Sequence, residues 1–300
     1  MKTITLGDLG NRMSVGLDVP SGSRPVEFGF RAWTTQDDLS IGKERADHQA
    51  MNPATLVDRI LARMLTHWGP HDFQGMGEAE RGLHLSRARA ADVFTAWAQL
   101  RRATLGNSLP EQIRCRGCRT TFVYDIDLST LECEVLEEGD FLHSEVDLFD
   151  GLTAEDRTGS HVHQSVVLQP VRWEVYRGLQ MKDLASAKQK IIAASVVGSG
   201  LGDDDQPHER LYLTPEFHGV TLSKQDLELL SDAIDQGAFG PRLRIEPTCP
   251  TCGFVTVESI SWVYDSFFSV RASSRLHRRK RSDDRSSISS STPKEGSPGI

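Results

Sequence analysis

The sequence predicts an α+β fold that consists of two pseudo-repeated lobes, each with helices and short antiparallel strands. Apolar residues recur with the 3.6-residue period of a helix in several segments and with the two-residue period of a strand in others. One order of segments (strand, helix, loop, helix, strand, cysteine pair, strand) occurs in each half of the chain. Each cysteine pair lies between two extended segments, as in the turn of a two-stranded ribbon.

The first half contains the strongest helix signal. Residues 26–33 are expected to form a strand, and the TTQDD segment behind them begins a polar helix. Residues 53–68 carry one apolar stripe at helical spacing, with Asn52 as the N-cap and Pro53 in the first turn.

A second helix and a strand are expected before and after the first cysteine pair. The helix covers residues 86–104, follows a Gly-rich loop and is ended by Gly106. In the run TFVYDIDL, the apolar residues Phe122, Tyr124 and Ile126 alternate with polar ones, which predicts a strand.

The second half repeats this order with different residues. A strand over 164–172 precedes a helix over 181–197, and a polar Gly/Asp loop follows. Ser223 and Asp226 form a capping box for the next helix, before the second cysteine pair and its flanking strands.

The two halves have nearly equal lengths. From Glu27 to Cys115 is 88 residues and from Val166 to Cys249 is 83. We interpret this as an internal duplication, although residue identity between the halves is low and a mixed α/β chain can show such an order by chance. The expected organisation is an N-terminal extension (1–19), a first lobe (20–135), an acidic linker (136–160), a second lobe (161–270) and a disordered basic, Ser-rich tail (271–300).

The composition is that of a globular protein with a sizeable core. The 300 residues are 38% hydrophobic and 25% charged, and this length suits one large domain or two of about 100–200 residues each. No segment has the roughly 20 apolar residues of a membrane span, and no apolar run follows Lys2 as in a secretory signal. We therefore expect a protein of the reducing cytoplasm with no membrane partner.

The charge is unevenly distributed. The chain carries −8, but residues 271–300 contain eight Lys or Arg and three Asp or Glu, so residues 1–270 carry −13. Such an acidic body repels a phosphate backbone, which argues against nucleic-acid binding by the folded part. The exception is a basic run in the tail, which could contact nucleic acid or an acidic partner or simply be solvated: Arg278, Arg279, Lys280 and Arg281.

The cysteines indicate a structural metal site. Cys115 with Cys118, and Cys249 with Cys252, form two C-x-x-C pairs, and Cys133 is expected to be a buried single thiol. Two intervening residues let a turn aim both sulfurs at one ion, about 2.3 Å from zinc. Each pair offers two ligands and a structural zinc takes four, so the sequence predicts one zinc per chain in a split four-cysteine zinc ribbon that joins the lobes.

The gap of 130 residues between the pairs does not exclude a shared site. Lengthening the closed loop from the usual 15–20 residues costs about 2 kcal/mol, whereas structural zinc contributes roughly 10–16 kcal/mol. Two alternatives remain open: turns that have lost the metal, and a redox dithiol. The redox reading is less favoured because such dithiols begin a helix, and a catalytic zinc because four thiolates leave no open position.

No pattern in the sequence points to catalysis. There is no Ser/His/Asp or Cys/His arrangement with a family-specific local motif, so we expect a protein that is not an enzyme and has no small-molecule substrate. His161 and His163 are interpreted as surface histidines. The GSGLG segment (198–202) leads into DDD and lacks the Lys-Ser/Thr of a phosphate-binding loop, so it is interpreted as a solvated loop.

Several motifs, in a fixed order over about residues 20–270, resemble one protein family. A helix ends in an L-R-x-x-T-x-G phrase, and a strand, a C-x-x-C pair and an acidic-apolar strand that ends in Asp-Leu follow. A Thr-x-x-Asp-Asp segment stands near the start and a double aromatic near the end. This order resembles the baseplate hub assembly proteins of T-even-type phages, other contractile-tailed phages and related injection systems. The residues that carry it are Leu100, Arg101, Thr104, Gly106, Asp127, Leu128, Phe267 and Phe268.

The resemblance implies a function in virion assembly. It implies a non-enzymatic phage or phage-like tail protein that acts in baseplate hub assembly, as a chaperone or minor structural component, through contacts with hub and tail proteins. Its place would be the host cytoplasm during assembly, or the tail baseplate. One departure is Arg119, where the family has Gly. The alternative is a zinc-ribbon nucleic-acid-binding or regulatory protein that uses the basic tail, and a hydrolase with an unrecognised site is the third option.

Overall fold

The structure, a computed structural model, confirms the α+β class. Helices and strands are mixed along the chain, and every strand pairing among the described residues is antiparallel. The tail 271–300, with its predicted basic run, lies outside the described residues. The structure describes residues 2–16, 26–47, 52–137, 142–155, 159–179, 184–202, 204–211, 213, 222–236, 239–263 and 267–268.

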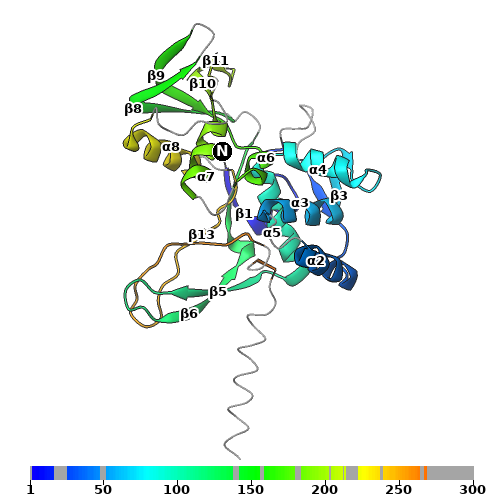
Figure 1. The fold of residues 1–300 in the computed structure, drawn as a ribbon. Coiled ribbons are helices and arrows are strands. Elements are labelled where there is room, and N and C mark those ends of the chain that lie inside the picture. The colour runs from blue at the N-terminus through cyan, green and yellow to red at the C-terminus, as the bar shows by residue number, and fades with distance from the viewer. Residues whose placement is uncertain are drawn as a thin grey trace, which may run out of the picture.

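The first half forms a helical body with a small three-stranded sheet, and a two-stranded ribbon follows it (Figure 1). The helices and strands of the body are β1 (Lys2–Thr5), α1 (Leu6–Leu9), β2 (Phe28–Phe30), α2 (Thr35–Asp47), α3 (Pro53–Met64), β3 (Leu65–Trp68), β4 (His71–Asp72), α4 (Glu78–Arg87) and α5 (Ala90–Leu105). The next elements are β5 (Ser108–Arg114), β6 (Thr121–Asp127), a 3-10 turn (Leu128–Thr130) and β7 (Glu132–Val135).

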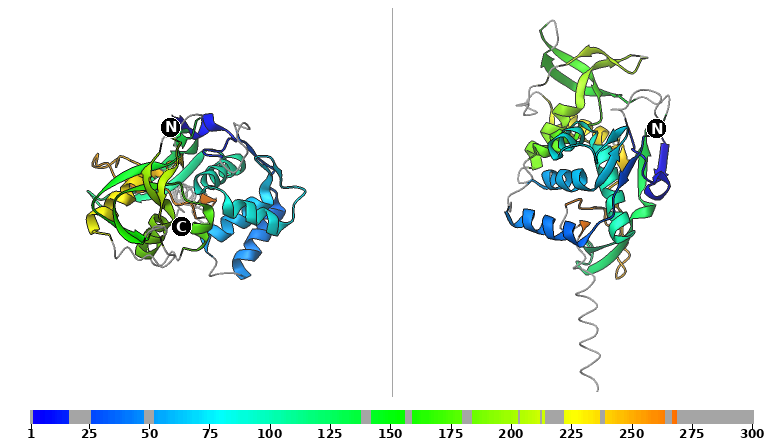
Figure 2. Two further views of the ribbon diagram at one scale, coloured as in Figure 1. Left: turned by 90° about the horizontal axis from the view of Figure 1, so that it is seen from above. Right: turned by 90° about the vertical axis from the view of Figure 1, so that its right-hand side faces the viewer.

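The second half forms a four-stranded sheet in the order β11-β10-β9-β8 and completes the ribbon. Its elements are β8 (Ser144–Glu155), β9 (Ser160–Leu168), α6 (Trp173–Arg177), α7 (Leu184–Ser195), β10 (Val196–Leu201), β11 (Pro207–Arg210), α8 (Lys224–Gln236), β12 (Gly240–Pro241), β13 (Arg244–Ile245) and β14 (Glu258–Ser259). Figure 2 shows this sheet and the ribbon at opposite ends of the molecule.

Helix α3 begins where the sequence predicts and ends one turn early. Asn52 caps it, since its Oδ1 accepts the N–H of Ala54 at 2.8 Å. Residues 65–68 form β3 rather than a last helical turn, because Leu65 is extended and the strand pairs with β2 and β4. Leu65 and Trp68 are buried in this strand, so their apolar character fits either conformation.

The helix predicted over 86–104 is divided between α4 and α5. The break lies at Ala88 and Arg89, which pair with the segment before α6. The N–H of Trp173 donates to Ala88 O and the N–H of Ala90 donates to Val171 O, both at 2.9 Å. This long-range bridge holds residues 88 and 89 extended, and no local sequence signal marks it.

Residues 144–155, within the predicted acidic linker 136–160, form β8 of the four-stranded sheet. Acidic residues alternate here with apolar ones, and Leu148, Leu152 and Ala154 are buried beneath the sheet. The predicted Gly/Asp loop likewise contains β10 and the start of the β10–β11 hairpin. In both segments the polar and acidic residues led to the prediction of a linker or loop where the structure has a strand.

The predicted cap of α8 is confirmed in part. Ser223 Oγ accepts the N–H of Asp226 at 3.1 Å. The carboxylate of Asp226 does not close a capping box at the helix start. It instead accepts the N–H groups of Phe149 at 2.7 Å and Asp150 at 3.0 Å, and so fastens α8 to β8.

Residues 2–16, predicted as part of an N-terminal extension, are built into the body. Strand β1 pairs with β7, and Leu6 and Leu9 of α1 are buried. The side-chain amide of Gln99 donates to Leu6 O at 2.7 Å and to Gly10 O at 2.6 Å. These contacts position the start of the chain against α5.

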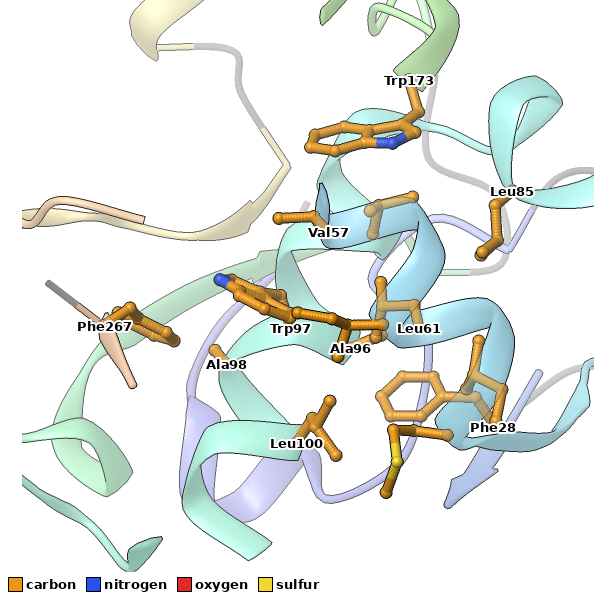
Figure 3. Close-up of a cluster of buried hydrophobic side chains, with 14 of the residues drawn as sticks. Phe28, Val57, Leu61, Leu85, Ala96, Trp97, Ala98, Leu100, Trp173 and Phe267 are labelled. Carbon is orange, nitrogen blue, oxygen red and sulfur yellow. The ribbon is translucent and has the colours of Figure 1, made fainter. Parts of the chain in front are cut away.

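Two large hydrophobic cores and a small cluster of Val15, Ala91 and Phe239 stabilise the fold, and the two large cores do not coincide with the predicted lobes. The larger core surrounds α3 and α5 (Figure 3) and includes Trp173, Ile260, Phe267 and Phe268 from the second half. The smaller core lies between the four-stranded sheet and the helices α7 and α8. Ile260, Phe267 and Phe268 therefore pack with the first half, and the two-lobe pseudo-repeat is not confirmed.

The two halves nevertheless share one order of elements. In the first, β2, two helices and the β3–β4 hairpin follow one another, and β3 lies between β2 and β4. In the second, β9, two helices and the β10–β11 hairpin follow, and β10 lies between β9 and β11. The duplication itself stays a prediction.

Candidate metal centre

Strands β5 and β6 form a hairpin that carries the first cysteine turn at its end. They pair in register from Ser108 with Asp127 to Arg114 with Thr121. The predicted alternation of β6 is confirmed, because Phe122, Tyr124 and Ile126 are at least partly covered while the residues between them are exposed. The second cysteine turn comes from the returning chain near β13 and β14, which pair with each other.

The two cysteine turns have the same backbone hydrogen bonds. In the first, Arg119 N–H donates to Cys115 O at 3.0 Å and Cys115 N–H donates to Thr120 O at 2.9 Å. In the second, Gly253 N–H donates to Cys249 O and Cys249 N–H to Phe254 O, each at 2.9 Å. Each turn thus aims both its sulfurs to one side.

The structure brings the four predicted ligands together. The sulfurs of Cys115, Cys118, Cys249 and Cys252 all lie within 4.8 Å of one another. The separation is 3.6 Å between Cys115 and Cys252 and 3.7 Å between Cys118 and Cys249. Four sulfurs at 2.3 Å from a tetrahedral zinc would be about 3.8 Å apart, so this arrangement fits a structural metal ion with four thiolate ligands.

The first cysteine of each turn is buried and the second is exposed. Cys115 and Cys249 are each 1% exposed, whereas Cys118 and Cys252 face solvent. The hydroxyl and the N–H of Thr120 lower the pKa of Cys118 to about 6. Burial would raise the pKa of Cys249, but the N–H groups of Cys252 and Thr251 outweigh it, and the pKa is lowered.

The pKa of Cys252, in contrast, is raised when no ion is bound. The N–H of Phe254 lowers the pKa of Cys252, but the neighbouring sulfurs, that of Cys118 first, raise it to about 11. Several thiolates in one place repel one another, and a bound cation removes this repulsion. The cluster is therefore suited to a cation rather than to four free thiols.

Cys133 is separate from the cluster, as the sequence predicts. Its side chain is fully buried in the larger core, and burial raises its pKa to about 12. It is an inert core thiol. The histidines agree less well with prediction, because His161 is exposed but His163 is 8% exposed and lies 3.8 Å from Glu209.

The motif residues near the ribbon base have structural contacts that explain their identity. Arg101 is buried, with 5% of its surface exposed, and its guanidinium is a hydrogen-bond donor to three carbonyl oxygens. It donates to Phe267 O at 2.7 Å and to Gly106 O and Ser108 O at 2.8 Å. Arg101 therefore ties the end of α5 to the start of β5 and to the C-terminal aromatic pair. The sequence offered this residue only as part of a motif, without a partner.

Surface residues of the ribbon were not singled out from the sequence. Phe254 is 46% exposed and Val255 is 50% exposed. A Cβ placed on Gly117 would lie 3.2 Å from the Cβ of Phe254, so the aromatic side chain packs against the first cysteine turn. The apolar run FVTV after the second cysteine pair was the available signal, and all of it except Thr256 is exposed.

Within the described ranges, the four-cysteine cluster is the one group of three or more His, Cys, Asp or Glu side chains arranged to hold a metal ion. The helices of the same ranges are too short or too polar to cross a membrane. A scan against protein-family models, a search of curated proteins and a search of solved structures each found no match to this chain.

Proposed function

We propose that this chain is a non-enzymatic phage or phage-like tail protein that acts in baseplate hub assembly. It works as a chaperone or minor structural component through contacts with hub and tail proteins. The observation that carries the proposal is the ordered motif set that resembles the T-even-type hub assembly family. In its support, residues of that set that are far apart in sequence are neighbours in space, as Arg101 and Phe267 are.

We further propose that the ion of the four-cysteine cluster is zinc. Four thiolates in a tetrahedron favour zinc over the hard cations, which prefer oxygen ligands. With all four positions taken by cysteine, the ion has a structural role. It fixes residues 115–118 to residues 249–252, and so fixes the returning chain on the β5–β6 hairpin.

The function is tested by capture of partners with the full chain. The tagged protein is co-expressed with the tail-tube, sheath, hub and spike proteins encoded beside it, and the complexes are isolated and identified. Capture of a hub or tube protein is the expected result. If none of these proteins is captured, or if genes for tail proteins do not neighbour this gene, the assembly function is wrong.

A zinc-dependence arm tests the role of the ribbon. The same capture is repeated after removal of the metal with a chelator, with circular dichroism recorded on each sample. We expect capture to fall while most of the helical signal remains, because α3 and α5 pack around a core away from the cysteines. Undiminished capture by metal-free protein would show that the ribbon does not position the binding surface.

Salt dependence separates this function from the nucleic-acid alternative. A protein that binds DNA through the basic run of the tail loses affinity steeply as salt rises, because each neutralised phosphate releases counterions. The tail-protein contact should depend weakly on salt. Tight, salt-sensitive DNA binding that is lost when residues 278–281 are changed to Ser would support the alternative.

A further inference from the structure

The ribbon carries an unusual share of the exposed apolar side chains. Nine large hydrophobic residues are exposed in the described part of the chain, and four of them are Val123, Phe254, Val255 and Val257. All four lie on β6 or between the second cysteine pair and β14. The ribbon also extends away from the helical body (Figure 1), so its outer end is not covered by the larger core.

The end of the ribbon is rich in arginine, although the body is acidic. Loaded with zinc on four thiolates, which together carry −2, it would have a net charge of +1, and its guanidiniums are its exposed cationic groups. We define the ribbon tip as residues 114–121 and 248–255, which contain both cysteine turns. Its charged side chains apart from the cysteines are Arg114, Arg116 and Arg119, all exposed, and it contains no Asp or Glu. Arg116 is 70% exposed and has one carboxylate within 4 Å, that of Glu258 at 3.7 Å. Residues 1–270 as a whole carry −13.

Basic and apolar groups are adjacent at this tip. Phe254 packs on Gly117, which stands between Arg116 and Cys118 in the first turn. An exposed aromatic ring packed on a turn that also carries exposed arginines can bury an apolar side chain while the guanidiniums pair with carboxylates in bidentate fashion.

We propose that the ribbon tip docks an acidic segment of a partner protein, in which Asp or Glu residues flank an apolar anchor. Charge complementarity supports a protein over a nucleic acid. Three guanidiniums can match a few carboxylates, whereas the residues of 1–270 outside the tip carry −16, a charge that repels a long polyanion. The inference rests on the proposed function in one respect only: the partner would be a hub or tail protein.

The binding test uses the full zinc-loaded chain and defined peptides. The probe is a fluorescein-labelled 12-residue peptide with four Asp or Glu and two Phe or Leu residues in a Ser/Gly background. Two control peptides replace the acids with Lys or the apolar residues with Ser. Fluorescence anisotropy should show saturable binding of the acidic-apolar probe, with a Kd tighter than about 0.1 mM, and markedly weaker binding of both controls.

Matched variants locate the binding at the tip. Phe254→Ser should raise the Kd of the acidic-apolar probe at least about tenfold, and Arg116→Gln should raise it at least about threefold. The matched controls are Phe149→Ser on β8 and Arg87→Gln on α4, which are exposed far from the ribbon and should stay within about twofold. Zinc content and melting temperature are measured for each variant. If Phe254→Ser loses zinc, Val255→Ser takes its place.

Four outcomes of the binding measurements overturn the proposal. They are no saturable binding of the acidic-apolar probe, equal weakening in the control variants, tighter binding of a 20-nucleotide oligothymidine that depends on the same tip residues, and a tip-dependent dimer in sedimentation. The last two would assign the tip to nucleic acid or to a second copy of the chain. Hub-protein capture that survives Phe254→Ser would also overturn it but leave the assembly function intact. Peptide binding at the tip without capture of any tail protein would overturn the assembly function but leave the tip proposal intact.

Discussion

Arg119 occupies a backbone conformation that its counterpart in the other cysteine turn fills with glycine. Its φ is 63°, and the φ of Gly253 at the equivalent place is 72°. A left-handed conformation costs a residue with a side chain about 1–2 kcal/mol, and glycine nearly nothing.

Arg119→Gly should therefore stabilise the protein. Relief of the left-handed strain, less the greater freedom of glycine in the unfolded chain, should raise the free energy of unfolding by about 1 kcal/mol in urea titrations of the zinc-loaded protein. Gly253→Ala should lower it by a similar amount, and through the backbone alone, since an added Cβ there meets no atom within 4 Å. Loss of stability in Arg119→Gly would mean that the arginine side chain outweighs the strain.

Asp58 is a buried carboxyl whose protonation links stability to pH. Burial raises its pKa to about 6, against the lowering effects of Arg177, whose Nε lies 2.8 Å away, and of the Trp173 indole. The unfolded chain has an ordinary Asp pKa near 3.9. Between these two values the folded state binds more protons than the unfolded state, so this group lowers the stability as pH rises from about 4 to about 6.

Asp58→Asn should remove this dependence. The free energy of unfolding of the variant minus that of the wild type should increase from pH 4 to pH 7, by at most about 3 kcal/mol. Arg177→Gln, which removes the nearby cation and so raises the pKa of Asp58 in the folded state further, should extend the fall in stability to higher pH. Urea titrations at several pH values measure both effects, and a difference that stays flat or decreases with pH would contradict the assignment.

At the level of elements, Asn52 joins α3 to α6 by two separate functions. Its Oδ1 caps α3, and its Nδ2 donates to Arg177 O at 2.9 Å and to Leu179 O at 2.7 Å. The cap is predicted by the sequence, whereas the amide contacts depend on α6, more than 120 residues away.

Two substitutions separate these functions. Asn52→Ser keeps a cap acceptor and removes the amide donors without adding a charge beside the carbonyl oxygens, and Asn52→Ala removes both. Loss of the cap should cost about 1 kcal/mol and loss of the carbonyl contacts about 1–2 kcal/mol more. We therefore expect Asn52→Ala to unfold at lower urea than Asn52→Ser, and Asn52→Ser at lower urea than wild type. Equal stability of Asn52→Ser and wild type would show that the link to α6 adds nothing.

At the scale of the whole molecule, the cysteine-bearing end of the ribbon stands apart from the cores, whereas Leu109 and Ile126 at the ribbon base belong to the larger core. The β8–β11 sheet has its own core with α7 and α8, and the C-terminal aromatic residues pack with Trp97 in the larger one. The four cysteines lie outside both clusters. The metal site therefore connects distant segments of the chain without being part of the packing that stabilises the body.

The purified protein should contain one zinc per chain. Cys115→Ser and Cys252→Ser should each abolish it, because three thiolates hold the ion far less tightly. Cys133→Ser is the matched control, since Cys133 is buried in the larger core and should leave the zinc content unchanged. Metal analysis of the dialysed proteins measures the ratio. Two ions per chain, or full retention in either ligand variant, would contradict the shared site.

The sequence by itself determined the elements and ligands whose signals are local. The cap of α3, the alternation of β6 and the two cysteine turns follow from neighbouring residues, and the count of four thiolates for one ion then predicts that the turns meet. One ion with four thiolate ligands requires the two cysteine pairs to meet. The long chain between the pairs does not prevent this, because the free energy of structural zinc binding exceeds the entropic cost of closing the longer loop by several kcal/mol.

Only the tertiary structure decided the features that depend on distant partners. Residues 88 and 89 leave the helix because they pair with the segment before α6, and residues 65–68 become a strand because β2 and β4 lie beside them. The segment 144–155 looks like an acidic linker until β9 pairs with it and buries its apolar residues. Phe267 and Phe268 join the first core rather than a second lobe. In each case the decisive hydrogen bonds and apolar contacts come from residues far along the chain, and local propensity is too weak to oppose them.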